Sequence, residues 1–452
     1  MRTIFEISKS GLKSAERSLS VTSNNIVNAD TPGYSRQRVE KSSIGQHMPG
    51  FHAGLGVNVS GITRLRNDLV DVHLSDKRQE MGFMQGQARI FEQLESAVAS
   101  DSGGDLDVRL GRLFDSFSEL SNDPQDFSVR NNLVGEAIQL TEKLADMDRS
   151  LNRISDVTRE SAGNTINQIN NLLRDLADLN KPITTSQAHG RPDNTSMDMQ
   201  VQKLEKLSEL VDIETMTGEN GSLEVRIGGV QVLSENNYRK IIPDNDDTAK
   251  LYGLRLENGT TIRPSGGTLT AAIAMYEETI PEMKDRLDLI AETMVTEIND
   301  IHRQGFGLED GIARDFFDPD FTSASEIRVS DVIHNNHEHI AASSIMGEAG
   351  NGNIAADLAE LRNERIIGGR KMVDYAVDLI SDPGSNLVKL RSSMESRESE
   401  IRMLEVQQER EAGVNIDEEL SLMIQYQNAY QGAARVMASA QQMYDTLISL
   451  VR

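Results

Sequence analysis

Hydrophobic and small residues near the N-terminus recur at alternating intervals of three and four. This is the 3.5-residue repeat of a helix with a narrow packing seam. The repeat runs to about Ala29 and is followed by Pro32, which cannot continue a helix, and Gly33, which permits a turn with positive φ. The sequence therefore predicts a first helix that ends near Ala29. Its seam positions are Phe5, Ser8, Leu12, Ala15, Leu19, Thr22, Ile26 and Ala29.

The C-terminal end shows the same repeat. Asn415 and Glu418 have the spacing of a capping box, which marks the start of a helix. A helix from there to the end of the chain would hold about 36 residues and extend about 54 Å. Its seam positions are Ile416, Leu420, Met423, Gln427, Tyr430, Ala434, Met437, Gln441, Tyr444, Ile448 and Val451.

The middle of the chain is also mainly helical in pattern. Heptads without proline predict a long helix over residues 127–180. Two prolines and a glycine predict a loop over 181–196, followed by a short helix over 197–212. Helical periodicity returns over 269–302. Heptads as sustained as these favour long packed helices over a compact α/β enzyme.

One segment changes character and is typical of strands separated by glycine-rich and asparagine-rich turns. It predicts a small β-rich module, and a shorter hairpin is possible near the N-terminus at 52–62. The expected strands of the module are residues 222–228, 230–233, 238–242 and 251–257.

Composition narrows the functional classes. The net charge is −25, from 46 basic and 71 acidic residues, so phosphate backbones should repel the chain and a nucleic-acid partner is not expected. The chain has no cysteine, which excludes disulfides, cysteine-based metal sites and thiol nucleophiles. The N-terminus does not read as a cleaved signal peptide, and no apolar run is long enough for membrane insertion.

Charge is also uneven along the chain. Residues 1–45 carry seven basic and four acidic side chains, and residues 413–452 carry two basic and four acidic ones. The two ends nearly cancel, so nearly the whole negative charge lies between them. Terminal helices of opposite sign could pack closely in an assembly while an acidic middle faces water.

The only histidine cluster is His334, His337 and His339. His337 and Glu338 begin like the zinc-protease motif H-E-x-x-H, but the second histidine would fall at Ala341. We therefore expect an exposed polar loop before a helix that starts at Ile340.

The acidic run at residues 244–247 does not match a calcium loop. An EF-hand needs glycine at position six and glutamate at position twelve, and those positions hold Ala249 and Arg255. Nucleotide-binding glycine motifs and the G-x-S-x-G nucleophile motif are missing from the sequence. We assign no catalytic residue, cofactor or metal, and do not expect an enzyme.

Particular residues at the two ends are more informative than the pattern. The run NNIVNADTPGY at residues 24–34 closely resembles the N-terminal signature of bacterial flagellar rod, hook and hook-associated proteins. The continuation SRQ is similar to the hook-associated protein 1 branch of that family, and so are GVNIDEE at 413–419 and QYQNAYQ at 425–431. The family's motif turn corresponds to Asn28, Pro32, Gly33 and Tyr34. Residues 194–202 depart from the family's acidic pattern.

The resemblance implies a structural protein of the junction between hook and filament, located outside the cell on the flagellum. Its members leave the cytoplasm through the flagellar type III export apparatus without a cleaved signal. They assemble with copies of themselves into a ring that contacts hook protein and a second hook-associated protein. A cytoplasmic export chaperone covers the C-terminal helix before export.

The fold expected from pattern and resemblance together is mainly α, with long antiparallel terminal and middle helices, paired N- and C-terminal ends and an inserted small β-rich domain. Residues 1–45 with 413–452 should form a terminal helical core, 46–212 with 268–412 a long-helix middle domain, and 213–267 an outer β-rich domain. The expected assembly interface comprises Phe5, Leu12, Ala15, Leu19 and Ile26 on the first helix and Leu420, Met423, Tyr430, Met437, Tyr444 and Ile448 on the last.

Other functions fit the pattern less well. A hook or distal-rod component would be built similarly, but residues 34–37 speak against it. A cytoplasmic coiled-coil adaptor would have no need to leave the cell. A secreted hydrolase would need convergent catalytic groups that the sequence does not show.

Overall fold

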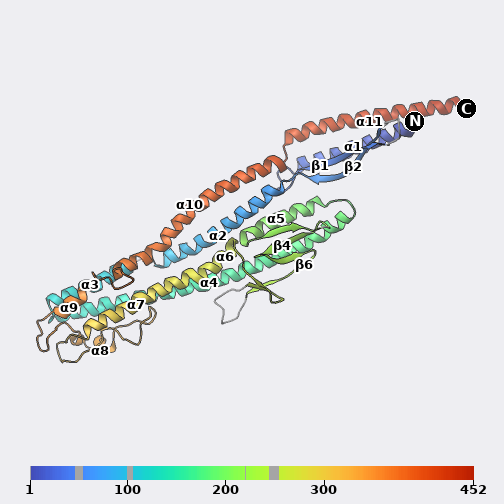
Figure 1. The fold of residues 1–452 in the computed structure, drawn as a ribbon. Coiled ribbons are helices and arrows are strands. Elements are labelled where there is room, and N and C mark those ends of the chain that lie inside the picture. Colours follow the sequence, from blue (N-terminus) through green and yellow to red (C-terminus); the bar gives the residue numbers. More distant parts are fainter. Residues whose placement is uncertain (1, 46–53, 99–104, 219, 244–253, 452) are drawn as a thin grey trace.

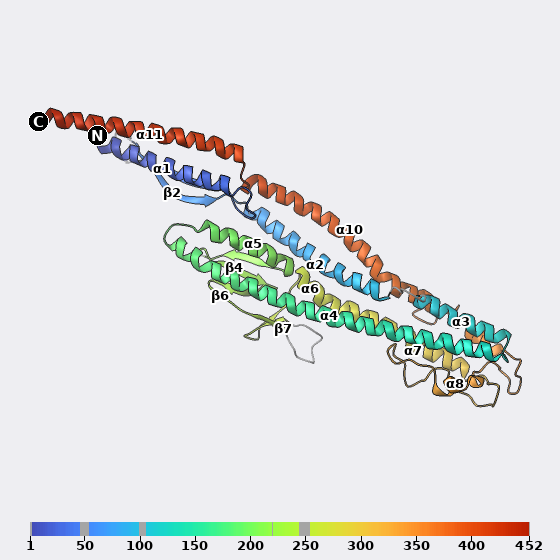
Figure 2. The ribbon, with the colours of Figure 1, turned by 180° about the vertical axis from the view of Figure 1, so that it is seen from behind.

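The computed structural model describes residues 2–45, 54–98, 105–218, 220–243 and 254–451. The protein is elongated, and its N- and C-terminal helices lie side by side at one end (Figures 1 and 2). We call the terminal unit the first helix α1 (Arg2–Val27), the strands β1 (Gln37–Gly45) and β2 (Gly54–Arg64), and the last helix α11 (Ile416–Val451). The remaining elements form the body.

The terminal unit is built on an antiparallel pair of helices, α1 (Arg2–Val27) and α11 (Ile416–Val451). A Cβ atom on Gly11 would lie 3.5 Å from the Cβ of Ala433, and Asn25 contacts Glu419. Fourteen residues separate the two contacts on each helix, so the register holds over two heptads. The predicted pairing of the chain ends is confirmed. The buried side of α1 consists largely of small residues, Ser8, Ser14, Ala15, Ser18 and Thr22.

A β-hairpin lies against α1. Strand β1 (Gln37–Gly45) pairs antiparallel with β2 (Gly54–Arg64). The hairpin predicted at 52–62 was therefore wrong in extent, since that range covers only part of the second strand. The first strand was missed because its residues are largely polar and half-buried or exposed, with no alternation of apolar side chains. The expected domain boundary after residue 45 falls between the two strands.

Helices α2 (Asp68–Val98) and α10 (Met372–Ala412) lead from the terminal unit into the body, packed against each other (Figure 1). One continuous hydrophobic core then runs through the body. The remaining body helices are α3 (Leu106–Asn122), α4 (Phe127–Ala188), α5 (Asn194–Leu210), α6 (Gly267–Ala274), α7 (Ile280–His302), α8 (Asp331–Asn335) and α9 (Asn353–Glu360).

The loop predicted over 181–196 was wrong for most of its length. Helix α4 continues through Pro182 to Ala188, and α5 already begins at Asn194. Pro182 has no N–H to bond the carbonyl of Asp178. Because Asp178 is exposed, water can donate to that carbonyl instead. Ile183 is buried in the helical conformation, and this burial favours continuation of the helix.

The β-rich region packs on α4 as two small antiparallel sheets, with strand orders β3-β4-β5-β6 and β7-β8-β9. The predicted strand at 238–242 is split between two sheets, and β3 and β9 were not predicted. Residues 251–253 of the strand predicted at 251–257 lie outside the described residues, and so does the acidic run at 244–247. The strands are β3 (Glu214–Thr217), β4 (Leu223–Ile227), β5 (Val230–Ser234), β6 (Asn237–Tyr238), β7 (Ile241–Pro243), β8 (Leu254–Leu256) and β9 (Thr261–Ile262).

Two buried asparagines of α4 hold these sheets. Asn170 donates to the carbonyl of Ile241 and accepts from its N–H, both at 2.8 Å. Asn180 does the same with Leu223, at 2.9 and 2.8 Å. The N–H and C=O of an extended residue point to the same side, so one side-chain amide can bond both as a neighbouring strand would.

The predicted helix over 269–302 is confirmed as a helical run that contains a π-helical turn, Met275–Thr279. The turn lies just before Pro281, whose missing N–H leaves the carbonyl four residues earlier without its usual donor.

Between α7 and α9 the chain is irregular apart from α8 and a short 3-10 turn, and two residues of α7 anchor this segment. Asn299 bonds both backbone groups of Phe317, and the imidazole of His302 accepts from the N–H of Ala341 at 2.9 Å. The helix predicted to start at Ile340 is absent, since that residue is extended. Its carbonyl instead accepts from the buried guanidinium of Arg130 at 2.8 Å.

The histidine cluster is only partly an exposed loop. His334 lies in the last turn of α8 and is exposed, whereas His337 and His339 belong to a short 3-10 turn and are half-buried. Across the described ranges, no group of three or more histidine, aspartate or glutamate side chains is placed to hold a metal ion. Nor is any helix in them long and apolar enough to cross a bilayer.

The buried imidazole of His302 should make stability depend on pH. Its Nε2 accepts from Ala341 and its Nδ1 lies 2.8 Å from the carbonyl of Arg314, so the neutral ring carries its proton on Nδ1. Burial lowers the pKa of His302 to about 4. As pH falls from 7 to 5 the unfolded imidazole takes up a proton and the folded one does not, which should cost about 2 kcal/mol of unfolding free energy.

We expect urea denaturation at pH 7 and pH 5 to show this loss in the wild type and in His73→Gln, a change at an exposed histidine. His302→Gln should be less stable at pH 7 but lose less on acidification. Equal losses in all three proteins would contradict the assignment.

Candidate functional site

The turn after α1 brings three segments together: the end of α1, the start of β1 and the start of α11. Tyr34 N–H donates to Thr31 at 3.1 Å to close the turn. Gly33 has φ +76°, and a Cβ there would overlap the side chain of Gln202. Only glycine suits this position. All four residues of the predicted motif turn lie here, with Asn28 and Tyr34 half-buried and Pro32 and Gly33 exposed.

Asn25 is the central residue of this junction and is fully buried. Its Nδ2 donates to the carbonyl of Gln37 at 2.9 Å and to Glu419 at 3.1 Å. Its Oδ1 accepts from the N–H of Gln37 at 3.0 Å and from the hydroxyl of Tyr34 at 2.8 Å. The amide thus uses its full hydrogen-bonding capacity and links α1, the turn, β1 and α11.

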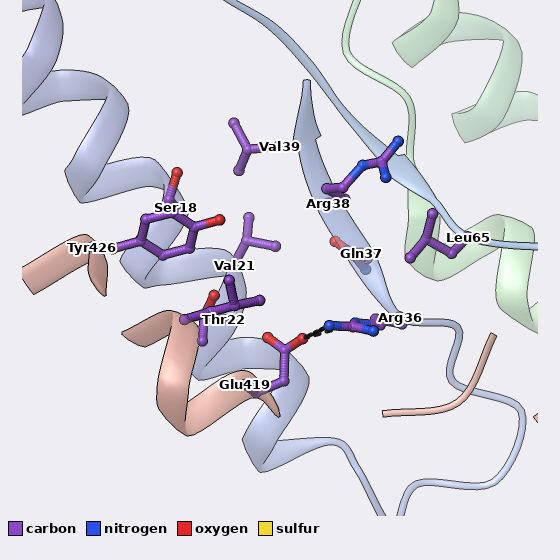
Figure 3. Close-up of a pocket in the computed structure, with 11 residues that line it drawn as sticks. Ser18, Val21, Thr22, Arg36, Gln37, Arg38, Val39, Leu65, Glu419 and Tyr426 are labelled. Atoms are coloured by element: carbon purple, nitrogen blue, oxygen red, sulfur yellow. Dashed lines mark hydrogen bonds and ion pairs between the residues drawn. The ribbon is translucent and has the colours of Figure 1, made fainter. Parts of the chain in front are cut away.

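Glu419 is equally buried and pairs with Arg36, whose Nε lies 2.8 Å from Oε1 (Figure 3). Arg36 also reaches the exposed Glu418 at 3.1 Å, and its N–H donates to Ala412 at the end of α10. Burial, together with the charges of Asp198 and Glu419, raises the pKa of Tyr34 to about 12, so its hydroxyl keeps its proton. The buried charge of Glu419 is therefore paired with that of Arg36.

A hollow of about 200 Å³ lies beside this ion pair, between α1, β1 and α11 (Figure 3). Its charged atoms at Arg36 and Glu419 are engaged with each other. Aliphatic and hydroxyl side chains make up most of the rest, among them Val21, Thr22 and Val39. This lining suits packing better than catalysis.

The structure places the predicted interface residues of α1 at different depths. Ala15 is buried, Leu12, Leu19 and Ile26 are half-buried, and Phe5 is 41% exposed.

On α11, the predicted stripe is mostly open. Met423 and Met437 are half-buried, whereas Leu420, Tyr430, Tyr444 and Ile448 are exposed. The deeply buried positions are instead Glu419 and Ala440, which a search for large apolar residues passes over. Whether the exposed side chains contact a second molecule stays a prediction.

The register of the pair leaves part of α11 uncovered. With Gly11 opposite Ala433, the helix beyond about residue 442 extends past Arg2, the first described residue of α1, and Figure 1 shows this projection. We call residues 443–451 the C-terminal overhang. Its apolar side chains are about half exposed: Met443, Tyr444, Leu447 and Ile448.

Asn25, Glu419 and Asp198 were not singled out as site residues from the sequence. A signal for the first two was present, since Asn25 lies in the motif at 24–34 and Glu419 in the motif at 413–419. Asp198 had no such signal, because its partners Ser35 and Arg64 are distant in the chain.

Comparison with known proteins gives matches along the whole chain. The protein-family model described as the flagellar hook-associated protein FlgK helical domain matches residues 91–317. A flagellar basal body rod FlgEFG C-terminal model matches 410–450, and a flagella basal body rod protein model matches 5–34.

Two relatives align over nearly their full length. Flagellar hook-associated protein 1 of Bacillus subtilis is 25% identical, with 98% of this chain and 97% of the relative covered. The protein of the same name from Salmonella typhimurium is 21% identical, with both chains fully covered. The solved structure of the flagellar hook junction protein FlgK from Burkholderia pseudomallei has a TM-score of 0.64 and 11% identity. That match covers 74% of this chain and 99% of the other, and it shows a shared fold.

Two adjacent glutamates provide a matched test of the junction. Glu419→Ala would leave Arg36 and Asn25 without their buried acceptor, which should weaken the docking of α1, β1 and α11 by about 3 kcal/mol. Glu418→Ala removes only a solvent-exposed partner and should cost less than about 1 kcal/mol. Hydrogen–deuterium exchange should accelerate at the C-terminal half of α1 and in β1 for the first variant alone. Equal exchange in both variants would argue against a central role for Glu419.

Proposed function

The chain belongs to the family of the flagellar hook-associated protein FlgK, and from this we propose that it forms the junction ring between the hook and the filament of a bacterial flagellum. The full-length relatives, named flagellar hook-associated protein 1, support a structural role in the flagellum, outside the cell. The rod-protein models matched at both chain ends support association with hook and other flagellar proteins.

The observation that carries this proposal is the terminal unit. A paired α1 and α11 leave apolar side chains exposed along α11, and the C-terminal overhang extends beyond the part of α1 that the structure describes. Exposed apolar side chains gathered on one helix are unfavourable in water, and such surfaces mark interaction sites. We infer that neighbouring subunits cover it in the ring, through the α1 and α11 positions predicted above.

The separation into a terminal unit, long body helices and a β-rich region suggests how the subunit is oriented in the ring. We propose that the terminal units form an inner core, that the long helices of the body form the next layer, and that the β-rich region lies outermost. All of the net negative charge lies between the two chain ends, where 37 basic and 63 acidic residues give −26, and this suits contact with water.

The proposed partners follow from this arrangement. Copies of the chain adjoin one another in the ring, hook protein lies on one side and a second hook-associated protein on the other. Before export through the flagellar type III apparatus, a cytoplasmic chaperone would cover α11, whose exposed apolar residues would otherwise promote self-association.

We propose no catalytic role. The family is a structural component of the flagellum, and the ionisable groups at the junction, Arg36, Glu418 and Glu419, are paired with one another. No catalytic, cofactor-binding or metal residue is assigned.

Deleting the gene in the flagellated source organism tests the function. We expect cells with intact hooks and no filaments, and flagellin released into the medium, because filament subunits would have no surface on which to assemble. Electron microscopy and immunoblotting of the medium measure both. Missing hooks would instead assign the protein to the rod or hook, and normal motility would refute a flagellar role.

A pair of substitutions tests the overhang. Tyr444 and Thr446 are two residues apart and lie on nearly opposite sides of α11, since each residue turns the helix by about 100°. Tyr444→Asp places a charge in the apolar stripe and should abolish swimming, with hooks present and filaments missing. Thr446→Asp places the same charge on the other side and should leave swimming intact. Both variants should be exported in equal amounts, and a motile Tyr444→Asp strain would contradict the proposed interface.

A further inference from the structure

The hydrophobic core of the protein stops before the terminal unit. The main cluster of buried apolar residues extends from Ala88 to Leu387, and among the described residues it includes none from α1, β1, β2 or α11. Buried apolar surface therefore contributes little to the angle between the terminal unit and the body. Polar contacts between the two units must fix this angle.

Three polar residues of α5 make that connection. Asn194, Asp198 and Gln202 are spaced four apart and share one face of the helix. All three contact the terminal unit or the turn within it, and we call them the α5 latch. Asn194 lies 3.4 Å from the carbonyl of Ile62, and Gln202 donates to the carbonyl of Pro32 at 2.5 Å.

Asp198 is the strongest part of the α5 latch. One carboxylate oxygen lies 2.8 Å from Nη1 of Arg64 at the end of β2, and the other accepts from the N–H of Ser35 at 3.4 Å. The side chains of Asp198 and Arg64 are only 10% and 14% exposed, so water screens the pair little. One carboxylate thus joins the body to both the hairpin and the motif turn.

The joint is open beside the α5 latch. A hollow of about 650 Å³ lies between the motif turn, α5 and the link from α10 to α11, with Tyr34, Val201 and Gly413 among its lining residues. Such a gap leaves room for the terminal unit to tilt. The covalent connections there are short, at residues 65–67 and 413–415.

We propose that the α5 latch is a positioning device that sets the angle at which the terminal unit leaves the body. With the latch closed the two units hold one relative orientation. With Asp198 removed each unit stays folded, and the terminal unit pivots on its two short connections into the open hollow. This inference concerns the single chain and does not depend on the proposed function.

The lack of cysteine makes a direct measurement possible. Gln168→Cys on α4 and Gln425→Cys on α11 place two spin labels at exposed positions, one on each unit. Double electron–electron resonance then gives the distribution of distances between the units in the full-length chain. A second pair, Gln168→Cys with Glu292→Cys on α7, lies wholly within the body and reports on its integrity.

We expect a single narrow distribution across the joint in the otherwise wild-type chain. Asp198→Ala should raise the ratio of undocked to docked molecules about thirtyfold, or about 2 kcal/mol at 1.4 kcal/mol per tenfold, and so broaden the distribution. Arg64→Ala should have the same effect from the other side of the contact. The double variant should add little to either single one, because both remove the same ion pair.

Asp178→Ala is the matched control, since it removes an exposed ion pair with Lys181 within α4 and should leave the distribution narrow. Distances within the body should stay unchanged in all variants. A narrow cross-joint distribution in both Asp198→Ala and Arg64→Ala would overturn the proposal. So would a broad distribution in the parent chain, or a change within the body that matches the change across the joint.

Discussion

A helix has no free backbone groups along its length with which to bond a strand, and this constraint governs how the non-helical parts of the protein are attached. The same solution occurs four times. Asn25, Asn170, Asn180 and Asn299 each project a buried side-chain amide that bonds the N–H and the C=O of one extended residue. Each amide replaces the edge of a strand at the surface of a long helix. The hairpin, both small sheets and the irregular segment after α7 depend on these contacts.

The two halves of the molecule are nevertheless held together by different forces. The body has a continuous apolar core, whereas the terminal unit relies on small residues, on the amide of Asn25 and on the buried pair of Arg36 and Glu419. A helix pair with so little apolar burial of its own gains stability when other surfaces cover it. This difference suits a protein whose body folds alone and whose ends are completed by assembly. Polar contacts between the two halves then determine the geometry with which the ends are presented.

Much of this architecture could be predicted from the sequence, because periodicity reports on the burial of one helix face. The terminal helices, their pairing and the β-rich insertion followed from heptads, turn residues and the motif at residues 24–34. The rest depended on contacts that no local pattern encodes. Pro182 was taken for a helix end because the buried contact of Ile183 that favours continuation is not visible in sequence. Asp198 was missed because Arg64 and Ser35 meet it only in the folded chain. On α11 the predicted seam includes Leu420, Tyr430 and Tyr444, which are exposed, whereas the buried positions are Glu419 and Ala440.

The central claim is that α1 and α11 of one chain form a single working unit, within the molecule and within the assembled flagellum. Gly11→Cys with Ala433→Cys tests it directly, since the two Cβ atoms would lie 3.5 Å apart, within the roughly 3.5–4.5 Å that a disulfide joins. The chain has no other cysteine, so oxidising isolated flagella and separating the protein on a non-reducing gel gives an unambiguous result. We expect an internally cross-linked monomer that migrates faster than the reduced protein. Covalent dimers or longer ladders would show that α11 pairs with α1 of a different copy, and would contradict the central claim.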